Sequence, residues 1–224
     1  MFCTAAQIYE LLIDNNITES FGNIKFNFLD VSVNIREKSA IGDLFQEWFA
    51  QWLEINDIEH RTSANTQEFP DFFLHSISNT INLLEVKTFD YSRSANFDVA
   101  NFEAYCRSLR TKAYRLDADY LIFAYLLIDS QFKIEKIWLK KIWQITGNSD
   151  KYPVKCQVKQ GAIYNIRPIT WFSQRAKFKP FNSRLEFATA LHKTLKQYPK
   201  TVISNNDWLD TVCENYLFHT GQRL

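Results

Sequence analysis

The chain has little of the residues that interrupt or cross-link a fold. Among its 224 residues are only five glycines, five prolines and four cysteines. With 46% hydrophobic and 16% aromatic residues, this scarcity excludes a disordered or low-complexity chain and predicts an ample hydrophobic core. The cysteines lie far apart and form no CxxC pair, which predicts reduced thiols and argues against a disulfide-linked fold.

Long apolar runs are also absent. The longest covers residues 120–128, which is too short for a membrane helix but ordinary for a buried strand. Residues 1–14 include no basic side chain and carry Glu10 and Asp14, so no secretion or transit signal is visible. We therefore expect a cytoplasmic protein without a membrane partner, built as a single domain over residues 1–224.

Several catalytic motifs are missing. The four histidines show no HxH or HExxH grouping, so a zinc site has no support. The sequence contains no GxxxxGK[ST] or GxGxxG run and no Gly-x-Ser-x-Gly elbow, which leaves nucleotide binding and serine hydrolase chemistry without residues. Metal-assisted hydrolysis is the chemistry for which residues are present.

What is present includes a strong asymmetry of charge. Residues 1–106 hold 16 acidic and 6 basic side chains, whereas residues 131–200 hold 15 basic and 3 acidic side chains. A polyanion would be attracted to the second region and repelled by much of the first. The sequence therefore predicts a basic DNA-binding region around residues 131–200, with a solvated lysine surface as the alternative.

Two apolar runs, residues 69–74 and 83–88, form the densest local signal. Small polar residues separate them, which predicts a β-hairpin with its loop near Ser78. A turn centred there sets Asp71 opposite Glu85. Because side chains alternate along a strand, Glu85 shares a face with Lys87 while its neighbours point into a core.

Two carboxylates and an ammonium then converge in this hairpin. Carboxylate and backbone carbonyl oxygens are hard donors suited to Mg²⁺, which typically takes one or two protein carboxylates and leaves other positions to water and phosphate. We therefore expect Asp71 and Glu85 to hold one or two Mg²⁺ ions, with the Val86 carbonyl as a candidate third ligand.

The run Pro70-Asp71, a gap of thirteen residues, then Glu85-Val86-Lys87 resembles the PD-(D/E)xK nuclease signature. Segments 42–48 and 66–72, and more weakly 164–168, are similar to a group of type II restriction endonucleases that includes GGNNCC cutters. The resemblance implies an α/β (α+β) fold, restriction-endonuclease-like, with a mixed central sheet flanked by helices. It also implies hydrolysis of double-stranded DNA that leaves 5′-phosphates.

The resemblance assigns roles to these residues. Asp71, Glu85 and Lys87 would be catalytic, with Lys87 orienting the attacking water and offsetting charge in the transition state. An acidic residue on the helix before the hairpin often completes the metal shell in this family, which makes Glu47 a candidate ligand. The alternative for Glu47 is a solvated carboxylate.

The expected partners follow from the same resemblance. A palindromic DNA site reads the same on both strands, so a protein of this size that cuts both would most simply bind as a two-fold homodimer. A cognate DNA methyltransferase is the expected functional companion. The alternatives are a repair or junction-resolving nuclease of the same fold, and a non-enzymatic DNA-binding module in which Asp71 and Lys87 form only an ion pair.

Two polar segments are candidates for DNA contact. The first leaves the second hairpin strand and carries Arg93, Ser94 and Asn96. The second, residues 171–184, has little regular pattern and is dense in hydrogen-bond donors, which read base edges or bind phosphates. Its candidates are Gln174, Arg175, Lys177, Lys179, Asn182 and Arg184.

The remaining patterns predict the secondary structure. Helices are expected from Thr4 to about Asn15, after Ser39 to Leu53, from a cap at Asn96 or Asp98 to Leu109, after Ser183 and after Asn206. Strands are expected at 24–35, as one strand with or without a bulge, at 119–128 and 132–139 joined near 129–131, and at 154–158 and 162–166 around Gln160-Gly161.

Overall fold

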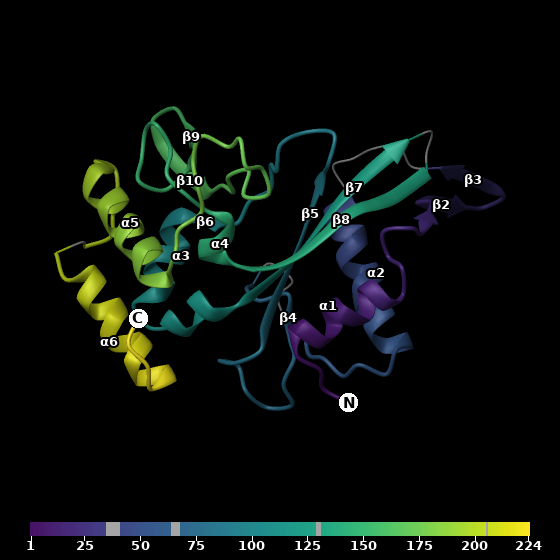
Figure 1. Cartoon of the computed structure of the whole chain (residues 1–224), viewed down its shortest axis with the longest axis horizontal. Helices are drawn as coiled ribbons and strands as arrows, with labels where there is room; N and C mark the ends of the chain where they lie inside the picture. The colour runs from purple at the N-terminus through teal and green to yellow at the C-terminus, as the bar shows by residue number, and fades with distance from the viewer. Residues whose placement is uncertain (35–40, 64–67, 129–130, 205) are drawn as a thin grey trace. The chain divides into compact units, whose positions relative to one another are not determined.

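The computed structural model describes residues 1–34, 41–63, 68–128, 131–204 and 206–224. The chain divides into two compact units, one formed by residues 1–95 and 119–140 and the other by residues 96–118 and 141–224. Each unit is described by itself below (Figure 1). The single domain expected over residues 1–224 stays a prediction.

The first unit contains a five-stranded mixed sheet. Its strands, in order across the sheet, are β1 (Phe21–Gly22), β8 (Gln131–Lys141), β7 (Asp119–Ile128), β5 (Leu83–Asp90) and β4 (Phe72–Phe73). β5 runs parallel to β7, whereas β4 is antiparallel to β5 and β1 is antiparallel to β8. The predicted mixed sheet is confirmed, and the predicted turn residues Asp129 and Ser130 lie outside the described residues.

Helices α1 (Ala5–Asp14) and α2 (Ile41–Ile55) complete the first unit. Thr4 caps α1 in a capping box with Gln7, so this helix begins where the sequence predicted. Four residues of the apolar stripe of α2 are buried, namely Ile41, Phe45, Phe49 and Leu53, and the Phe45 and Phe123 ring centroids lie 4.5 Å apart. The apolar side chains whose spacing predicted this helix therefore also pack it against the sheet. Its predicted cap, Ser39, lies outside the described residues.

The prediction for residues 24–35 was wrong. Instead of one strand, the chain forms an antiparallel hairpin of β2 (Lys25–Phe28) and β3 (Val31–Asn34), which is a two-stranded sheet of its own. It reverses direction at Leu29, whose φ of 51° lies in the left-handed region. A leucine disfavours that conformation, so the turn carried no recognisable signal.

The second unit contains a three-stranded antiparallel sheet and a set of helices. The sheet has the order β6 (Ala100–Asn101), β10 (Ala162–Ile166) and β9 (Cys156–Lys159). The helices are α3 (Phe102–Leu109), the 3₁₀ helix η1 (Ala113–Asp117), α4 (Ile142–Ile145), α5 (Arg184–Gln197) and α6 (Trp208–Thr220). The predicted hairpin around Gln160 and Gly161 is confirmed, with both residues at positive φ.

The predicted cap of α3 was wrong. Asn101, and not Asn96 or Asp98, caps the helix by accepting a 3.0 Å hydrogen bond from the Ala104 amide. The chain stays extended until Asn101 because β6 pairs with the distant strand β10. That pairing overrides the earlier capping signals.

The remaining expectations concern the thiols and the membrane. All four cysteines are free, and burial raises the pKa of the Cys156 thiol to about 12. Cys106 is fully buried, and its backbone carbonyl accepts a 2.9 Å hydrogen bond from the Trp208 indole. No helix within the described ranges is long and apolar enough to cross a membrane.

Candidate active site

The β4–β5 hairpin carries the two candidate carboxylates. Phe72 pairs with Leu84 in an antiparallel register. Continuing that register by one residue sets Asp71 opposite Glu85, which is the arrangement the sequence predicted. The hairpin thus brings two acidic side chains together from positions fourteen residues apart.

Two hydrogen bonds hold these carboxylates in place. The Asp71 amide donates to Glu85 Oε2 at 3.3 Å, and the Val86 amide donates to Asp71 Oδ2 at 2.8 Å. Each carboxylate therefore accepts from the backbone of the opposite strand. Such bonds orient a carboxylate more firmly than a contact between two flexible side chains does.

Lys87 completes the group. Its Nζ donates to Glu85 Oε1 at 2.7 Å, and the Glu85 residue is only 7% exposed. A carboxylate this buried requires charged or polar partners, and Lys87 supplies one. Leu84 and Val86 lie in the hydrophobic core, so the alternation predicted for this strand is confirmed.

Burial and a neighbouring negative charge both raise the pKa of the Asp71 carboxyl. Burial, followed by the charge of Glu85, raises the pKa of the Asp71 carboxyl to about 7. Lys87, the Val86 amide and a hydrogen bond from the Gln46 side chain oppose this rise. A cation bound beside these carboxylates would oppose both causes, because it favours their ionised form.

Asp71 lines a polar cavity of about 460 Å³. The α2 helix contributes Asp43, Gln46 and Glu47 to its wall, and the chain before β4 contributes Glu68. Glu47 is exposed, and the structure places it in the same cavity as Asp71. This position suits an outer ligand of a cation and equally suits a solvated carboxylate.

Sequence reasoning missed Gln46. Its side chain hydrogen-bonds Asp71 and thereby lowers the pKa of that carboxyl. A glutamine on an amphipathic helix has no local signature of such a role. The available clue was spacing, because positions 43, 46 and 50 lie on one side of α2 and all line the cavity.

The donor set fits a hard divalent cation bound mainly by oxygen. In the part of the chain that the structure describes, no group of three or more His, Cys, Asp or Glu side chains is arranged to hold a metal. The two carboxylates that the hairpin brings together, Asp71 and Glu85, match the incomplete protein shell that Mg²⁺ accepts.

The first DNA-contact candidates lie beyond the end of β5. Arg93 is highly exposed, and its Nε lies 3.9 Å from an Asp90 carboxylate oxygen. Ser94 is exposed. In the second unit, Asn96 Oδ1 accepts a 3.0 Å hydrogen bond from Arg167, whose guanidinium also pairs with Asp98.

The second set of DNA-contact candidates lies in residues 171–184, a segment with little regular structure, as predicted. Several hydrogen bonds and ion pairs fix its conformation. These bonds join Lys177 to Asp150, Lys179 Nζ to the Gln174 carbonyl, Asn182 to Glu186 and Arg184 to Asp117. Arg184 also lies over the Tyr216 ring, so its guanidinium has structural partners. Arg175 is exposed, and its backbone amide donates a 3.3 Å hydrogen bond to the Ser173 hydroxyl oxygen.

Comparisons with known proteins show which family the chain belongs to. A family model for the NgoBV restriction endonuclease matches residues 2–224. The type II restriction enzyme NlaIV of Neisseria lactamica is 39% identical over 224 residues, covering 99% of this chain and 92% of that protein. The type II restriction enzyme NgoBV of Neisseria gonorrhoeae is 34% identical over 169 residues, covering 70% and 90%.

A solved structure extends the likeness to the fold. The NlaIV restriction endonuclease superposes with a TM-score of 0.94 at 36% identity, covering all of this chain and 92% of the other. The class is therefore the type II restriction endonucleases, as the sequence predicted, and not a repair nuclease or a non-enzymatic binding module. Within that class, the chain belongs to the NgoBV restriction endonuclease family.

Proposed function

We propose that this enzyme hydrolyses double-stranded DNA at a palindromic site with Mg²⁺ as cofactor, leaving 5′-phosphates. The observation that supports it best is the Asp71–Glu85–Lys87 group, in which a carboxylate pair and an ammonium are ordered by main-chain hydrogen bonds. This is the arrangement of the PD-(D/E)xK signature, in which two carboxylates hold the cation and a lysine lies beside the reacting phosphate.

The chain's own residues would divide the work as follows. Asp71 and Glu85, with the Val86 carbonyl, would hold one or two ions against the scissile phosphate, and Glu47 would join them through the shared cavity. Bound Mg²⁺ supplies a polarised phosphoryl oxygen and a water of lowered pKa. Lys87, already 2.7 Å from Glu85, would orient the attacking water and offset the negative charge that builds on the phosphate.

The partners are also part of the proposal. The basic region of residues 131–200, of which residues 141–200 belong to the second unit, would supply most of the positive charge that binds the DNA backbone. Two copies would bind a palindrome with matching two-fold symmetry. A DNA methyltransferase of the same specificity would protect host DNA in the cytoplasm.

A plasmid digest tests the proposal. Supercoiled plasmid should give discrete fragments with Mg²⁺ and remain intact with chelator, and ligase should rejoin the fragments because they carry 5′-phosphates. Random nicking would contradict site specificity, and cleavage that persists in chelator would contradict the role of the metal. A Glu85→Lys variant, which places an ammonium where the cation would bind, should be inactive under every metal condition.

A further inference from the structure

The β2–β3 hairpin has one apolar face. Phe26 pairs with Val33, and Phe28 pairs with Val31. Residues directly opposite each other in an antiparallel pair lie on the same face, so these four side chains form a single surface, called here the apolar hairpin face. The stacking of the two phenylalanine rings, with centroids 6.3 Å apart, agrees with this assignment.

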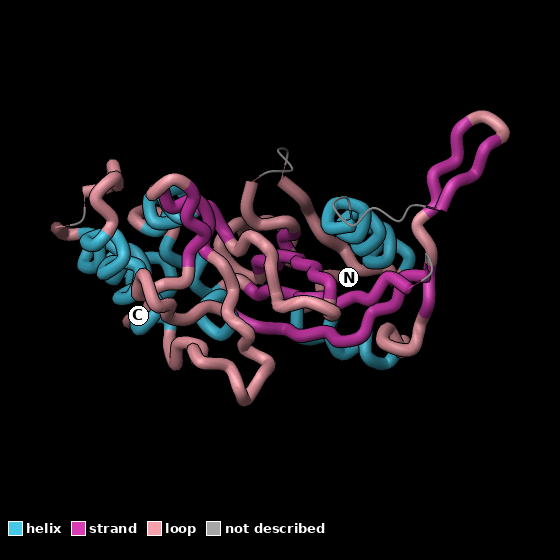
Figure 2. The backbone as a smooth tube through the Cα atoms, turned by 90° about the horizontal axis from the view of Figure 1, so that it is seen from above, coloured by secondary structure: helices cyan, strands magenta, loops and turns pink. Residues whose placement is uncertain are grey.

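The opposite face is polar, because Lys25 pairs with Asn34 and Asn27 pairs with Ser32. This alternation is typical of a sheet that buries one side. Yet Phe28 is 65% exposed, and every residue of both strands is exposed. Figure 2 shows the hairpin standing away from the other elements of the first unit. An isolated two-stranded hairpin is marginal in water, so this pattern calls for a covering partner.

Leu29 at the tip points to the same conclusion. Its φ of 51° is unfavourable for leucine and easy for glycine or asparagine. Its side chain is 87% exposed, so packing within this chain does not compensate for the strain. A turn that served only to reverse the chain would carry one of the easier residues. Leucine instead adds apolar surface beside the apolar hairpin face.

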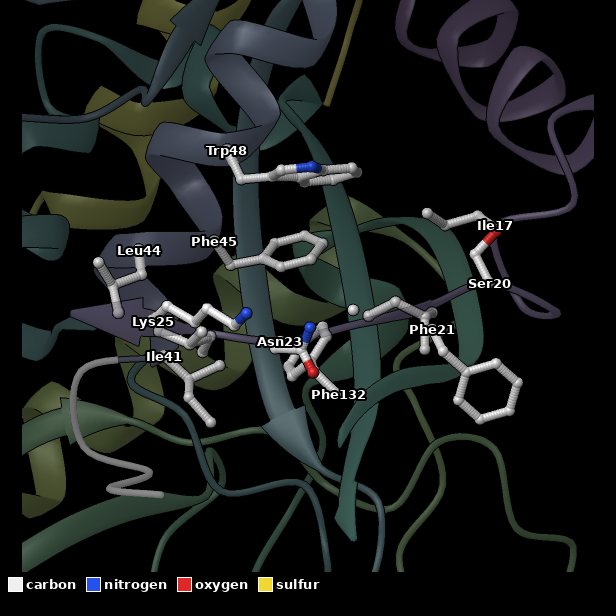
Figure 3. A pocket seen from close by; sticks show the side chains of 13 residues that line it. Ile17, Ser20, Phe21, Asn23, Lys25, Ile41, Leu44, Phe45, Trp48 and Phe132 are labelled. Carbon is white, nitrogen blue, oxygen red and sulfur yellow. The ribbon is translucent and has the colours of Figure 1, made fainter. Parts of the chain in front are cut away.

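An apolar pocket of about 490 Å³ adjoins the base of the hairpin and shares Lys25 with it. Figure 3 shows the Phe45 and Trp48 rings extending from α2 into this pocket. Phe21, which also lines it, is 66% exposed. The body of the first unit therefore also exposes apolar side chains near the base of the hairpin.

We infer that the apolar hairpin face, with Leu29, pairs with the same face of a second copy of this chain in a two-fold interface. The inference rests on the proposed function, because a protein of this size that cuts both strands of a palindrome would most simply bind it as two copies. The four side chains of the face are uncharged, so identical surfaces meet without like-charge repulsion. Covering these five side chains would remove about 1,200 Å² from two copies, the lower bound for a specific interface.

The experiment compares two glutamates placed on one strand. Phe28→Glu puts a charge on the apolar hairpin face, and Asn27→Glu puts the same charge on the polar face one residue away. Light scattering of the full chain should give the mass of two 26.5 kDa chains for the wild type and for Asn27→Glu, and of one chain for Phe28→Glu. The uncharged double variant Phe26→Ala/Phe28→Ala should also give one chain, which guards against misfolding caused by the glutamate.

The outcomes separate the interface from the activity. A wild type with the mass of one chain, or a folded double variant that keeps the mass of two, overturns the inference. If the wild type has the mass of one chain, the apolar hairpin face would instead be covered by another protein or by a lipid surface. Plasmid cleavage by the same preparations is scored independently. A wild type that pairs but does not cleave contradicts the proposed function alone, whereas one that cleaves and ignores Phe28→Glu contradicts the interface alone.

Discussion

The two units differ most in charge. The first carries 17 acidic and 9 basic side chains, and the second carries 8 acidic and 17 basic side chains. The carboxylate pair lies in the acidic unit, where the surroundings favour a cation over a phosphate. The net charge of +1 conceals this difference, and under the proposed function the acidic unit would hold the metal and the basic unit would attract DNA.

The largest expected effect is the loss of cleavage when active-site residues of the acidic unit are replaced. Asp71→Ala or Lys87→Ala should lower the cleavage rate by about 10²–10³-fold or more, because each removes a preorganised charge that acts in the transition state. DNA affinity measured in Ca²⁺ should change little. The exposed lysine Lys136 of β8 provides the control, since Lys136→Ala should cleave at close to the wild-type rate. Wild-type cleavage by Lys87→Ala would remove that residue from the mechanism.

Protonation of Asp71 should link metal binding to pH. Because its pKa is raised to about 7, the carboxyl must lose a proton to bind Mg²⁺ at lower pH. As the pH is raised towards 7, the Mg²⁺ concentration needed for half-maximal cleavage should fall about tenfold for each pH unit. Above pH 7 this concentration should stay constant. An Mg²⁺ titration at several pH values measures this, and a flat profile would contradict the assignment.

The same shift affects stability with the opposite sign. The native state keeps the Asp71 proton up to about pH 7, whereas the unfolded carboxyl loses it near its ordinary value of 3.8. Without metal, the free energy of unfolding should therefore fall as pH rises from about 4 to 7. Thermal unfolding checks this, with Asp71→Asn as the variant that should lose this component of the pH dependence.

A smaller effect is expected on the basic side. Neutralising Lys177 and Lys179 to glutamine should weaken binding to cognate and random duplexes by similar factors and flatten the salt dependence, because phosphate contacts release counterions without reading sequence. Arg175→Gln should instead cost about 1–3 kcal/mol on cognate DNA alone if Arg175 reads a guanine. Binding titrations at two salt concentrations distinguish these cases. Unchanged affinities and slopes in all variants would place the DNA elsewhere.

For Arg184, a change in DNA affinity must be separated from a change in stability. It already pairs with Asp117 and lies over the Tyr216 ring, so Arg184→Gln should lower stability as well as any DNA affinity. The variant must be compared at equal fraction folded. A loss of cognate affinity without loss of stability would show that the guanidinium leaves Asp117 to read DNA.

The smallest effect concerns the scaffold of the basic segment. A Cβ on Gly147 would lie 2.5 Å from the Lys179 carbonyl oxygen and 2.9 Å from Ile169 Cδ1. Gly147→Ala should therefore lower the free energy of unfolding by about 1–3 kcal/mol, the usual cost of overpacking. Gly22→Ala in the first unit meets no atom within 4 Å and is the matched control. Denaturant unfolding of both variants measures the difference. Equal stabilities would show that the backbone at Lys179 moves aside at little energetic cost.

Local periodicity made the active-site hairpin predictable. Alternation placed Glu85 and Lys87 on one face, and the small polar residues before Leu83 located the turn closely enough to set the register with Asp71. The core helix α2 was predictable for the same reason, because its apolar stripe repeats every three or four residues.

Long-range and strained features were not predictable. Asn101 replaced Asn96 as the helix cap because β6 pairs with β10 some sixty residues later in the chain. The β2–β3 turn was missed because its left-handed residue is a leucine. The ion pair between Arg184 and Asp117 joins residues 67 positions apart, which no local pattern encodes. The roles of the site residues, including Glu47 and the DNA-contact candidates, remain predictions.

The reciprocal hydrogen bonds between Asp71 and the β5 strand also have a consequence for host safety. A slip of β4 against β5 by one residue would turn Asp71 to the opposite side of the sheet and break both bonds. A chain in which this hairpin has not formed lacks both bonds and the ordered carboxylate pair. If this pair holds the cation as proposed, a defect in the hairpin should silence the nuclease and not relax its specificity.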